Sequence, residues 1–159
     1  MQRIYLIILS IILSSGIVLI DLWSKSWATY YLMNREMPLI GSFISLNLHH
    51  NSGIAFSLPI VGSPLLGITT ILLIGVLARW IYVIYKSTHS TKEQIIEIIA
   101  LAMILGGGIG NGYERFMQGY VIDFIDISYF AICNIADIFI SFGAILYVIL
   151  SFFTHERDQ

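Results

Sequence analysis

Four long apolar stretches alternate with polar segments along the chain. They cover residues 4–27, 64–85, 94–113 and 129–153. Each has roughly the 20 mostly apolar residues that an α-helix needs to cross a ~30 Å hydrocarbon core. Because backbone polar groups in lipid must be satisfied internally, helices are the expected structure. The pattern predicts a single integral membrane domain over residues 1–159, an all-α polytopic protein with four transmembrane helices.

The connection over residues 28–63 has a different period. Apolar and polar residues alternate over residues 44–48, as they do along a strand with one buried face. A turn signal begins at Asn51. We therefore expect a small extracytoplasmic β element at the outer ends of the helices. The shorter connection, residues 114–128, is rich in acids and is expected to be a loop.

Composition supports a membrane protein and excludes several other classes. Hydrophobic residues make up 57% of the chain and charged residues 11%, with a mean hydropathy of +0.85. A soluble domain has roughly 25% charged residues and could not cover its surface with so few. Eight Lys and Arg against ten Asp and Glu leave no basic surplus for a nucleic acid. The single cysteine, Cys133, excludes an intrachain disulfide framework and a cysteine-rich metal site.

The positive charges predict an orientation. In a four-span topology, five of the eight Lys and Arg fall on one side, which places both termini and residues 87–92 in the cytoplasm. Arg3 before an apolar run is also typical of a secretory signal peptide. No A-x-A-like cleavage site follows Ile20, so we expect an uncleaved helix. Arg79, inside the second span, is interpreted as snorkelling to the interface.

Ionisable residues inside membrane spans are costly and usually functional. Asp137 lies inside the fourth span, about two turns from its predicted start, and Asn134 lies three residues before it on the same helix face. Asp123 precedes this span and is flanked by apolar residues. Alone, Asp123 fits helix capping or loop solvation, and Asp137 fits a buried carboxylate paired with Arg115. Together, the two carboxyl groups can converge near the outer interface.

Two close carboxyl groups favour a particular chemistry. Both cannot ionise cheaply, so one pKa rises and the other falls, and the pair titrates as a unit. The ionised member can deprotonate a water while the protonated member donates to a scissile carbonyl. This is the chemistry of an aspartic peptidase, which needs neither a metal nor a cofactor.

Five short motifs, in this order, resemble those of the signal peptidase II (lipoprotein signal peptidase) family. Asp21 and Lys25 fit D-x-x-x-K, residues 51–56 fit N-x-G-x-A-[FW], residues 106–115 fit G-x-x-G-N-x-x-D-R, residues 121–126 fit V-x-D-F-[IL]-D, and residues 134–137 fit the end of F-N-x-A-D. The resemblance implies an aspartic endopeptidase with Asp123 and Asp137 as its catalytic dyad. It implies substrate-binding or supporting roles for Asp21, Lys25, Asn51, Gly53, Asn111, Glu114, Arg115, Asn134 and Ala136. Glu114 stands where the family usually has Asp, and Cys133 where it usually has Phe.

The resemblance also implies a substrate and a location. The substrate is a prolipoprotein whose lipobox cysteine carries diacylglycerol, and cleavage just before that cysteine releases the signal peptide. The enzyme is expected in the bacterial cytoplasmic (inner) membrane, with its active site near the outer face and the β element, about residues 43–56, forming a cradle over it. The expected partners are these substrates and membrane lipid. We expect a monomer, with no nucleic acid, cofactor or metal.

Other functions fit the sequence less well. A small proton-coupled transporter would suit four spans but would need one essential carboxylate rather than two. A cysteine peptidase using Cys133 with His49 or His50 is disfavoured, because a thiol in an apolar helical context is usually inert. Adjacent histidines on a strand point to opposite faces, which argues against a metal site. The G-x-G-D signature of presenilin-type proteases is absent, because Asn111 follows Gly110.

Overall fold

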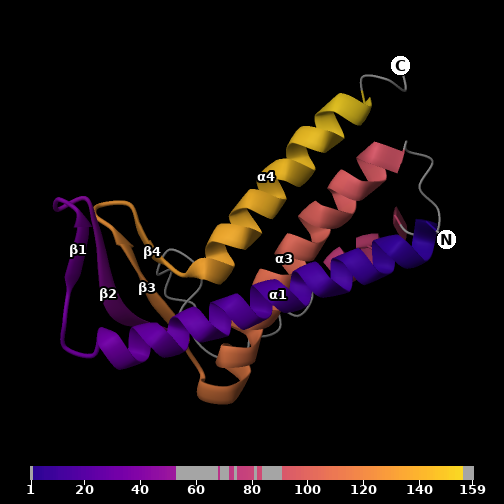
Figure 1. Cartoon of the computed structure of the whole chain (residues 1–159). Coiled ribbons are helices and arrows are strands. Elements are labelled where there is room, and N and C mark those ends of the chain that lie inside the picture. The colour runs from indigo at the N-terminus through magenta and orange to yellow at the C-terminus, as the bar shows by residue number, and fades with distance from the viewer. Residues whose placement is uncertain are drawn as a thin grey trace.

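The computed structural model describes residues 2–52, 68, 72–73, 75–80, 82–83 and 91–155. The elements within this part of the chain are α1 (Gln2–Tyr31), β1 (Met37–Ile40), β2 (Ile44–Asn51), α3 (Thr91–Gln118), β3 (Val121–Ile127), β4 (Ala131–Cys133) and α4 (Ile135–His155). Figure 1 shows the three long helices side by side, with the strands gathered at one end of them.

The three helices are long and apolar enough to cross a membrane, and this chain is a multi-pass membrane protein. At 1.5 Å per residue, the 30 residues of α1 and the 28 of α3 span about 45 and 42 Å, whereas the 21 of α4 span about 31 Å. A ~30 Å hydrocarbon core is therefore just filled by α4, and α1 and α3 extend beyond it. Most of the predicted second span, residues 64–85, lies outside the described residues, and those described within it are helical.

The strands form one antiparallel sheet in the order β1-β2-β3-β4. The predicted β element is confirmed as β1 and β2. The expected loop over residues 114–128 is wrong, because α3 continues to Gln118 and β3 then pairs with both β2 and β4.

The fourth helix begins later than its apolar run. The predicted span started at residue 129, but α4 starts at Ile135, after the β4 strand. Asp137 therefore lies in the first turn of α4, not two turns inside it. A continuous apolar run does not distinguish a short strand from a helix, so hydropathy placed the boundary too early. The chain reverses before β4 at Tyr129, whose φ of 63° is incompatible with a continuing helix.

Two apolar clusters hold the sheet and helices together. Near the end of α1, Ala28 and Leu32 pack with Ile122 and Phe124 of β3. These contacts fix β3 against α1 and so determine the position of Asp123, which lies between the two packed residues of the strand.

The second cluster is centred on Leu6, Val83, Ile98 and Leu101, near the start of α3. Arg79 lies on this side of the molecule, and its guanidinium donates to the carboxylate of the buried Glu97 of α3. The expected snorkelling of Arg79 is corrected accordingly, because the side chain forms an ion pair between helices.

Candidate active site

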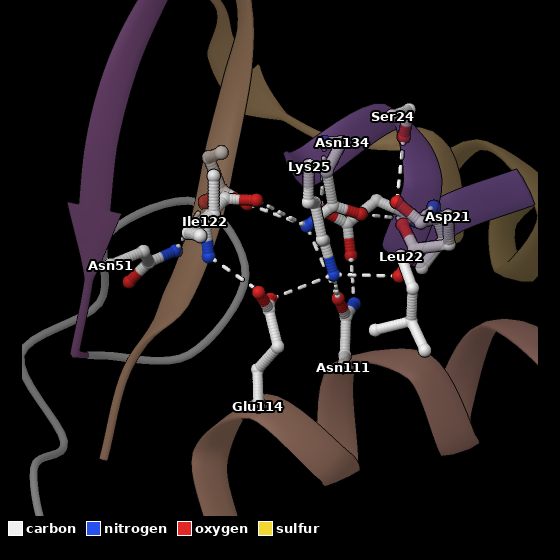
Figure 2. Close-up of polar contacts among 12 residues, drawn as sticks. Asp21, Leu22, Ser24, Lys25, Asn51, Asn111, Glu114, Ile122 and Asn134 are labelled. Atoms are coloured by element: carbon white, nitrogen blue, oxygen red, sulfur yellow. Dashed lines mark hydrogen bonds and ion pairs between the residues drawn. The ribbon is translucent and has the colours of Figure 1, made fainter. Parts of the chain in front are cut away.

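Lys25 is the centre of a buried polar network between the helices. Its Nζ lies 2.7 Å from Asp21 Oδ2 and 2.9 Å from Glu114 Oε2. It also donates to Asn111 Oδ1 at 2.8 Å. Figure 2 shows Lys25 pointing from α1 toward Asn111 and Glu114 of α3. A buried ammonium is costly without partners. Three acceptors around the three protons of Nζ make this position favourable.

Asp21 connects this network to the start of α4. Spaced four residues before Lys25, it lies on the same face of α1. Its Oδ1 accepts from the backbone N–H of Ala136 at 2.9 Å. That N–H has no acceptor within the first turn of α4, and the positive end of the helix favours an anion there. Ala136, one of the predicted supporting residues, therefore contacts the network through its backbone N–H.

Two glycines of α3 make this close approach possible. A Cβ at Gly110 would lie 2.6 Å from Asp21 Oδ2, and one at Gly107 would lie 2.5 Å from the carbonyl oxygen of Ala136. Both distances are shorter than a carbon–oxygen contact allows. The glycine-rich stretch of α3 therefore lets three helices meet at the polar network.

Asn134 caps α4 and fixes the orientation of Asp137. The Asn134 Oδ1 accepts from the Asp137 N–H at 3.0 Å, and the Asn134 N–H donates to Asp137 Oδ2 at 3.3 Å. This reciprocal pair is a capping box with an Asn and an Asp in place of the commoner Ser or Thr and Glu. The two residues were expected on one helix face. In the structure, Asn134 precedes the helix.

Side-chain amides hold both acids of the predicted dyad. Asp123 accepts from Asn51 Nδ2 at 2.8 Å through Oδ2, and from Asn134 Nδ2 at 2.6 Å through Oδ1. Asp137 Oδ1 accepts from Asn111 Nδ2 at 2.8 Å. Asn134 Nδ2 also donates to Asn111 Oδ1 at 3.1 Å. The two carboxyl groups are thus joined through two neighbouring amides.

Asp123 has an altered acidity. Only 2% of its surface is exposed. The pKa of Asp123 is raised from a usual value of 3.8 to about 6, mainly by burial; the hydrogen bond from Asn51 opposes the rise, and the nearby charge of Asp137 adds to it. A carboxyl group with this pKa retains its proton well above the usual range, as a general acid requires.

Glu114 joins α3 to β3 beside Asp123. Its Oε2 accepts from the Ile122 N–H at 3.1 Å while contacting Lys25, and its Oε1 accepts from Gln118 Nε2 at 3.1 Å. Sequence reasoning identified Glu114 but missed the contribution of Ile122. A backbone donor has no side-chain signature, so no pattern in the chain could have revealed it.

A largely apolar cavity of about 500 Å³ lies beside Asp137. It is bounded by α3, α4, the β3–β4 turn and, among the described residues of the second apolar stretch, Leu72, Leu73 and Val76. Asn111, Arg115 and Asp137 supply polar groups to its wall. Arg115 is thus placed beside Asp137. Gly53, the remaining predicted supporting residue, lies outside the described residues.

Cys133 also lines this cavity. Burial, together with the nearby charges of Asp137 and Asp123, raises the pKa of its thiol to about 11. The thiol is therefore protonated at neutral pH and is a poor nucleophile. It lies in a strand, not in the helical context expected, but the prediction of low reactivity agrees with this environment.

Comparison with known proteins identifies the family. Residues 13–153 match the family model described as signal peptidase (SPase) II. A lipoprotein signal peptidase of Francisella tularensis subsp. novicida (strain U112) is 37% identical over 154 residues, covering 92% of this chain and 93% of the relative. One from Caldicellulosiruptor bescii is 36% identical over 140 residues, covering 88% and 87%.

Solved structures agree with the sequence match. One, described as a bacterial membrane enzyme structure by the in meso method at 2.3 Å resolution, superposes with a TM-score of 0.76 at 26% identity. The match covers 94% of this chain and 91% of that one. A second, at 1.9 Å resolution, gives a TM-score of 0.71 at 27% identity over 88% and 90%. This chain belongs to the signal peptidase II family of aspartic peptidases, which remove the signal peptides of lipoproteins.

Proposed function

We propose that Asp123 and Asp137 are the catalytic dyad with which this peptidase removes lipoprotein signal peptides. The observation that carries the proposal is the pairing of the buried Asp123 with the partly buried Asp137 through Asn134 and Asn111. The transporter alternative needed only one essential acid, and the match to a peptidase family replaces it.

The dyad acts as a general base and a general acid. The ionised carboxylate takes a proton from a water, whose oxygen attacks the scissile carbonyl carbon, while the protonated partner donates to the carbonyl oxygen. As the tetrahedral intermediate collapses, the C–N bond breaks and the leaving nitrogen takes the proton that the first carboxyl gained from the water. One hydroxyl of the intermediate returns its proton to the second carboxylate as the C=O bond re-forms. One proton remains on the pair, so the dyad is ready for the next cycle. The amides of Asn51, Asn111 and Asn134 hold both carboxyl groups in position.

The substrate we propose is a prolipoprotein with diacylglycerol on its lipobox cysteine, cut just before that cysteine. The apolar cavity beside Asp137 supports this choice, because its lining suits acyl chains or an apolar peptide. Since α3 and α4 form its walls, such a substrate approaches laterally from the membrane. Arg115 is the cationic group of the wall and is suited to a polar part of the substrate.

A membrane topology accompanies this proposal. The chain forms one domain and acts as a monomer, with a fourth transmembrane helix over residues 64–85. Both termini are cytoplasmic, and the sheet forms a cradle over the active site at the outer face of the inner membrane. The excess of positive charge at the opposite ends of the helices supports this orientation.

Cleavage of a purified, diacylglyceryl-modified prolipoprotein, followed by gel shift, tests the dyad. Asp123→Asn and Asp137→Asn should each abolish cleavage, and the double variant should be no worse, because residues acting as a unit are non-additive. Asp126→Asn is the matched control, as Asp126 lies on the same strand but is partly exposed, and it should keep its activity. Thermal unfolding in detergent checks that each variant is folded. Substantial turnover by either single dyad variant would disprove the assignment.

A further inference from the structure

The two turns of the sheet form a single unit at one end. Figure 1 shows the β1–β2 and β3–β4 turns at the end of the sheet that lies away from the end of α1. The Ser128 N–H donates to the Phe43 carbonyl at 2.9 Å, and the Ser128 hydroxyl donates to the Ser42 carbonyl at 2.6 Å. Each turn is also closed by its own hydrogen bond, Phe43 N–H to the Ile40 carbonyl and Phe130 N–H to the Ile127 carbonyl, both at 2.9 Å.

This rigid end exposes four large apolar side chains. Ile40 and Phe43 come from the first turn, and Tyr129 and Phe130 from the second, and all four are exposed. We call these four residues the apolar lip. Residues 39–44 and 127–131 contain no charged side chain. An exposed apolar patch held on a hydrogen-bonded scaffold indicates a contact surface.

Tyr129 reinforces this interpretation. It is fully exposed, and its φ of 63° lies in the left-handed region, which is uncommon for a bulky residue. The strained backbone costs about 1–3 kcal/mol and places the ring outward instead of against the sheet. Tyrosine is also a residue enriched at the membrane–water interface.

The position of the lip relative to α4 identifies what covers it. Because α4 has only the length needed to cross the hydrocarbon core, its first turn lies at the outer boundary of that core. Phe130 lines the same cavity as Asp137, Ile138 and Phe142 of the first turns of α4. Phe130 therefore lies near the lipid boundary, and the hydrogen bonds of Ser128 hold the other turn of the lip beside it. The end of α1 extends beyond that boundary.

We propose that the apolar lip inserts into the outer lipid leaflet and forms the lipid-side entrance of the cavity. Acyl chains of a lipidated substrate pass from the leaflet across Phe130 into the apolar cavity beside Asp137. This second step rests on the proposed function, whereas insertion of the lip rests on the proposed topology and not on the dyad. The occupant of the surface is membrane lipid. A second copy of the chain is the competing occupant that the experiment distinguishes.

Depth measurements with spin labels test the insertion. Phe43→Cys and Tyr129→Cys, each in a Cys133→Ala background, are labelled with a nitroxide and reconstituted in phosphatidylethanolamine–phosphatidylglycerol vesicles. Collisions with oxygen should exceed those with a water-soluble nickel chelate at both sites. The control is Glu36→Cys, an exposed position beyond the end of α1, which should favour the nickel chelate.

Two results would overturn the insertion. Nickel accessibility at the lip equal to that at residue 36 would mean that the lip is in water. Spin–spin broadening that disappears on dilution with unlabelled protein would identify a second copy as the occupant. Neither measurement requires catalysis, so both are independent of the dyad assignment.

The kinetic consequence is tested with Phe43→Ser/Tyr129→Ser, which spares Phe130 in the cavity wall. In vesicles, KM for the lipidated substrate should rise at least about tenfold with kcat unchanged, since burial of even one large apolar side chain is worth that much. In detergent micelles the variant should match the wild type. Tyr30→Ser removes an exposed aromatic of α1 and should leave KM unchanged. An unchanged KM in vesicles, or an equal loss in micelles, would disprove the entrance role. If instead the dyad assignment is wrong, Asp123→Asn or Asp137→Asn will keep its activity.

Discussion

Two ion pairs with buried carboxylates, Lys25 with Asp21 and Glu114, and Arg79 with Glu97, lie at opposite ends of α3 and differ in what they connect. Lys25 contacts two carboxylates and an amide, and these lead to the start of α4, to β3 and to the cavity beside Asp137. Arg79 contacts one carboxylate, Glu97, and its guanidinium lies over the rings of Tyr82 and Tyr147.

Both pairs fit the rule that charges within a membrane are paired. Only the Lys25 network reaches residues that can do chemistry. Burial and pairing of a charge therefore do not by themselves indicate a functional site. The Lys25 network and the Arg79–Glu97 pair differ in the residues that their paired carboxylates contact in turn.

Neutralising each cation should separate the two roles, with the largest effect at Lys25. Lys25→Met leaves Asp21 and Glu114 buried without their ammonium, so we expect a loss of about 3–5 kcal/mol in stability. Cleavage per folded molecule should fall at least about a hundredfold, because the support of both dyad residues shifts. Arg79→Met should cost about 1–3 kcal/mol, since this side chain is partly exposed and screened.

The measurement is the initial cleavage rate of lipidated substrate, normalised to folded protein, together with unfolding in a denaturing detergent. Arg79→Met should keep its rate per folded molecule within about threefold, an energy below 1 kcal/mol. Equal losses of rate in the two variants would show that both pairs are merely structural.

The structure brings together several residues that the sequence singled out as candidates, and their functional roles stay a prediction. Side chains such as Asp21, Lys25 and Asn111 are conspicuous because a polar residue beside a membrane span is rare. The start of α4 was harder to predict, since the apolar run continues without interruption from residue 129. The spacing of Asn134 and Asp137 is a capping signature and could have placed the helix start correctly. The backbone donors of Ile122 and Ala136 could not be predicted, because the fold alone brings them to their carboxylates.

Changing the length of each acidic side chain should show how strongly the cleavage rate depends on the position of its carboxyl group. Asp123→Glu and Asp137→Glu displace a reacting carboxyl by ~1 Å, which can cost about a hundredfold in rate. Glu114→Asp should stay within about tenfold, because the long Lys25 side chain can follow the shorter acid. Glu114→Ala should lose activity or stability. If Asp123→Glu were as active as Glu114→Asp, Asp123 would not be a reacting group.

Adding one methyl group should test the close approach of the helices. Gly110→Ala places a Cβ against Asp21 Oδ2 and should lower the cleavage rate by about tenfold through displacement of the network. Gly16→Ala, on α1, meets no atom within 4 Å. It should leave the rate unchanged and favour the helix by up to about 1 kcal/mol. Comparable rates for the two variants would show that α3 can move away without consequence.

The prediction with the smallest effect concerns pH. The pH dependence should follow the titration of Asp123 and should not involve the Arg79–Glu97 pair. Because the folded-state pKa of Asp123 is raised to about 6, the folded protein binds a proton that the unfolded chain has released above pH ~4. The protonated form therefore contributes stability below about pH 4, and that contribution is lost as the pH rises through 6.

If this proton is the one that the dyad donates, kcat/KM should fall over the same pH range, which then forms the alkaline limb of a bell-shaped profile. Asn51 donates to Asp123 and opposes the rise. Asn51→Ala should therefore move the limb to higher pH, while Arg79→Met leaves it in place, as pH–rate profiles with the lipidated substrate will measure. A limb that moved to lower pH in Asn51→Ala would contradict a hydrogen bond to the ionised form and place the titration on another group.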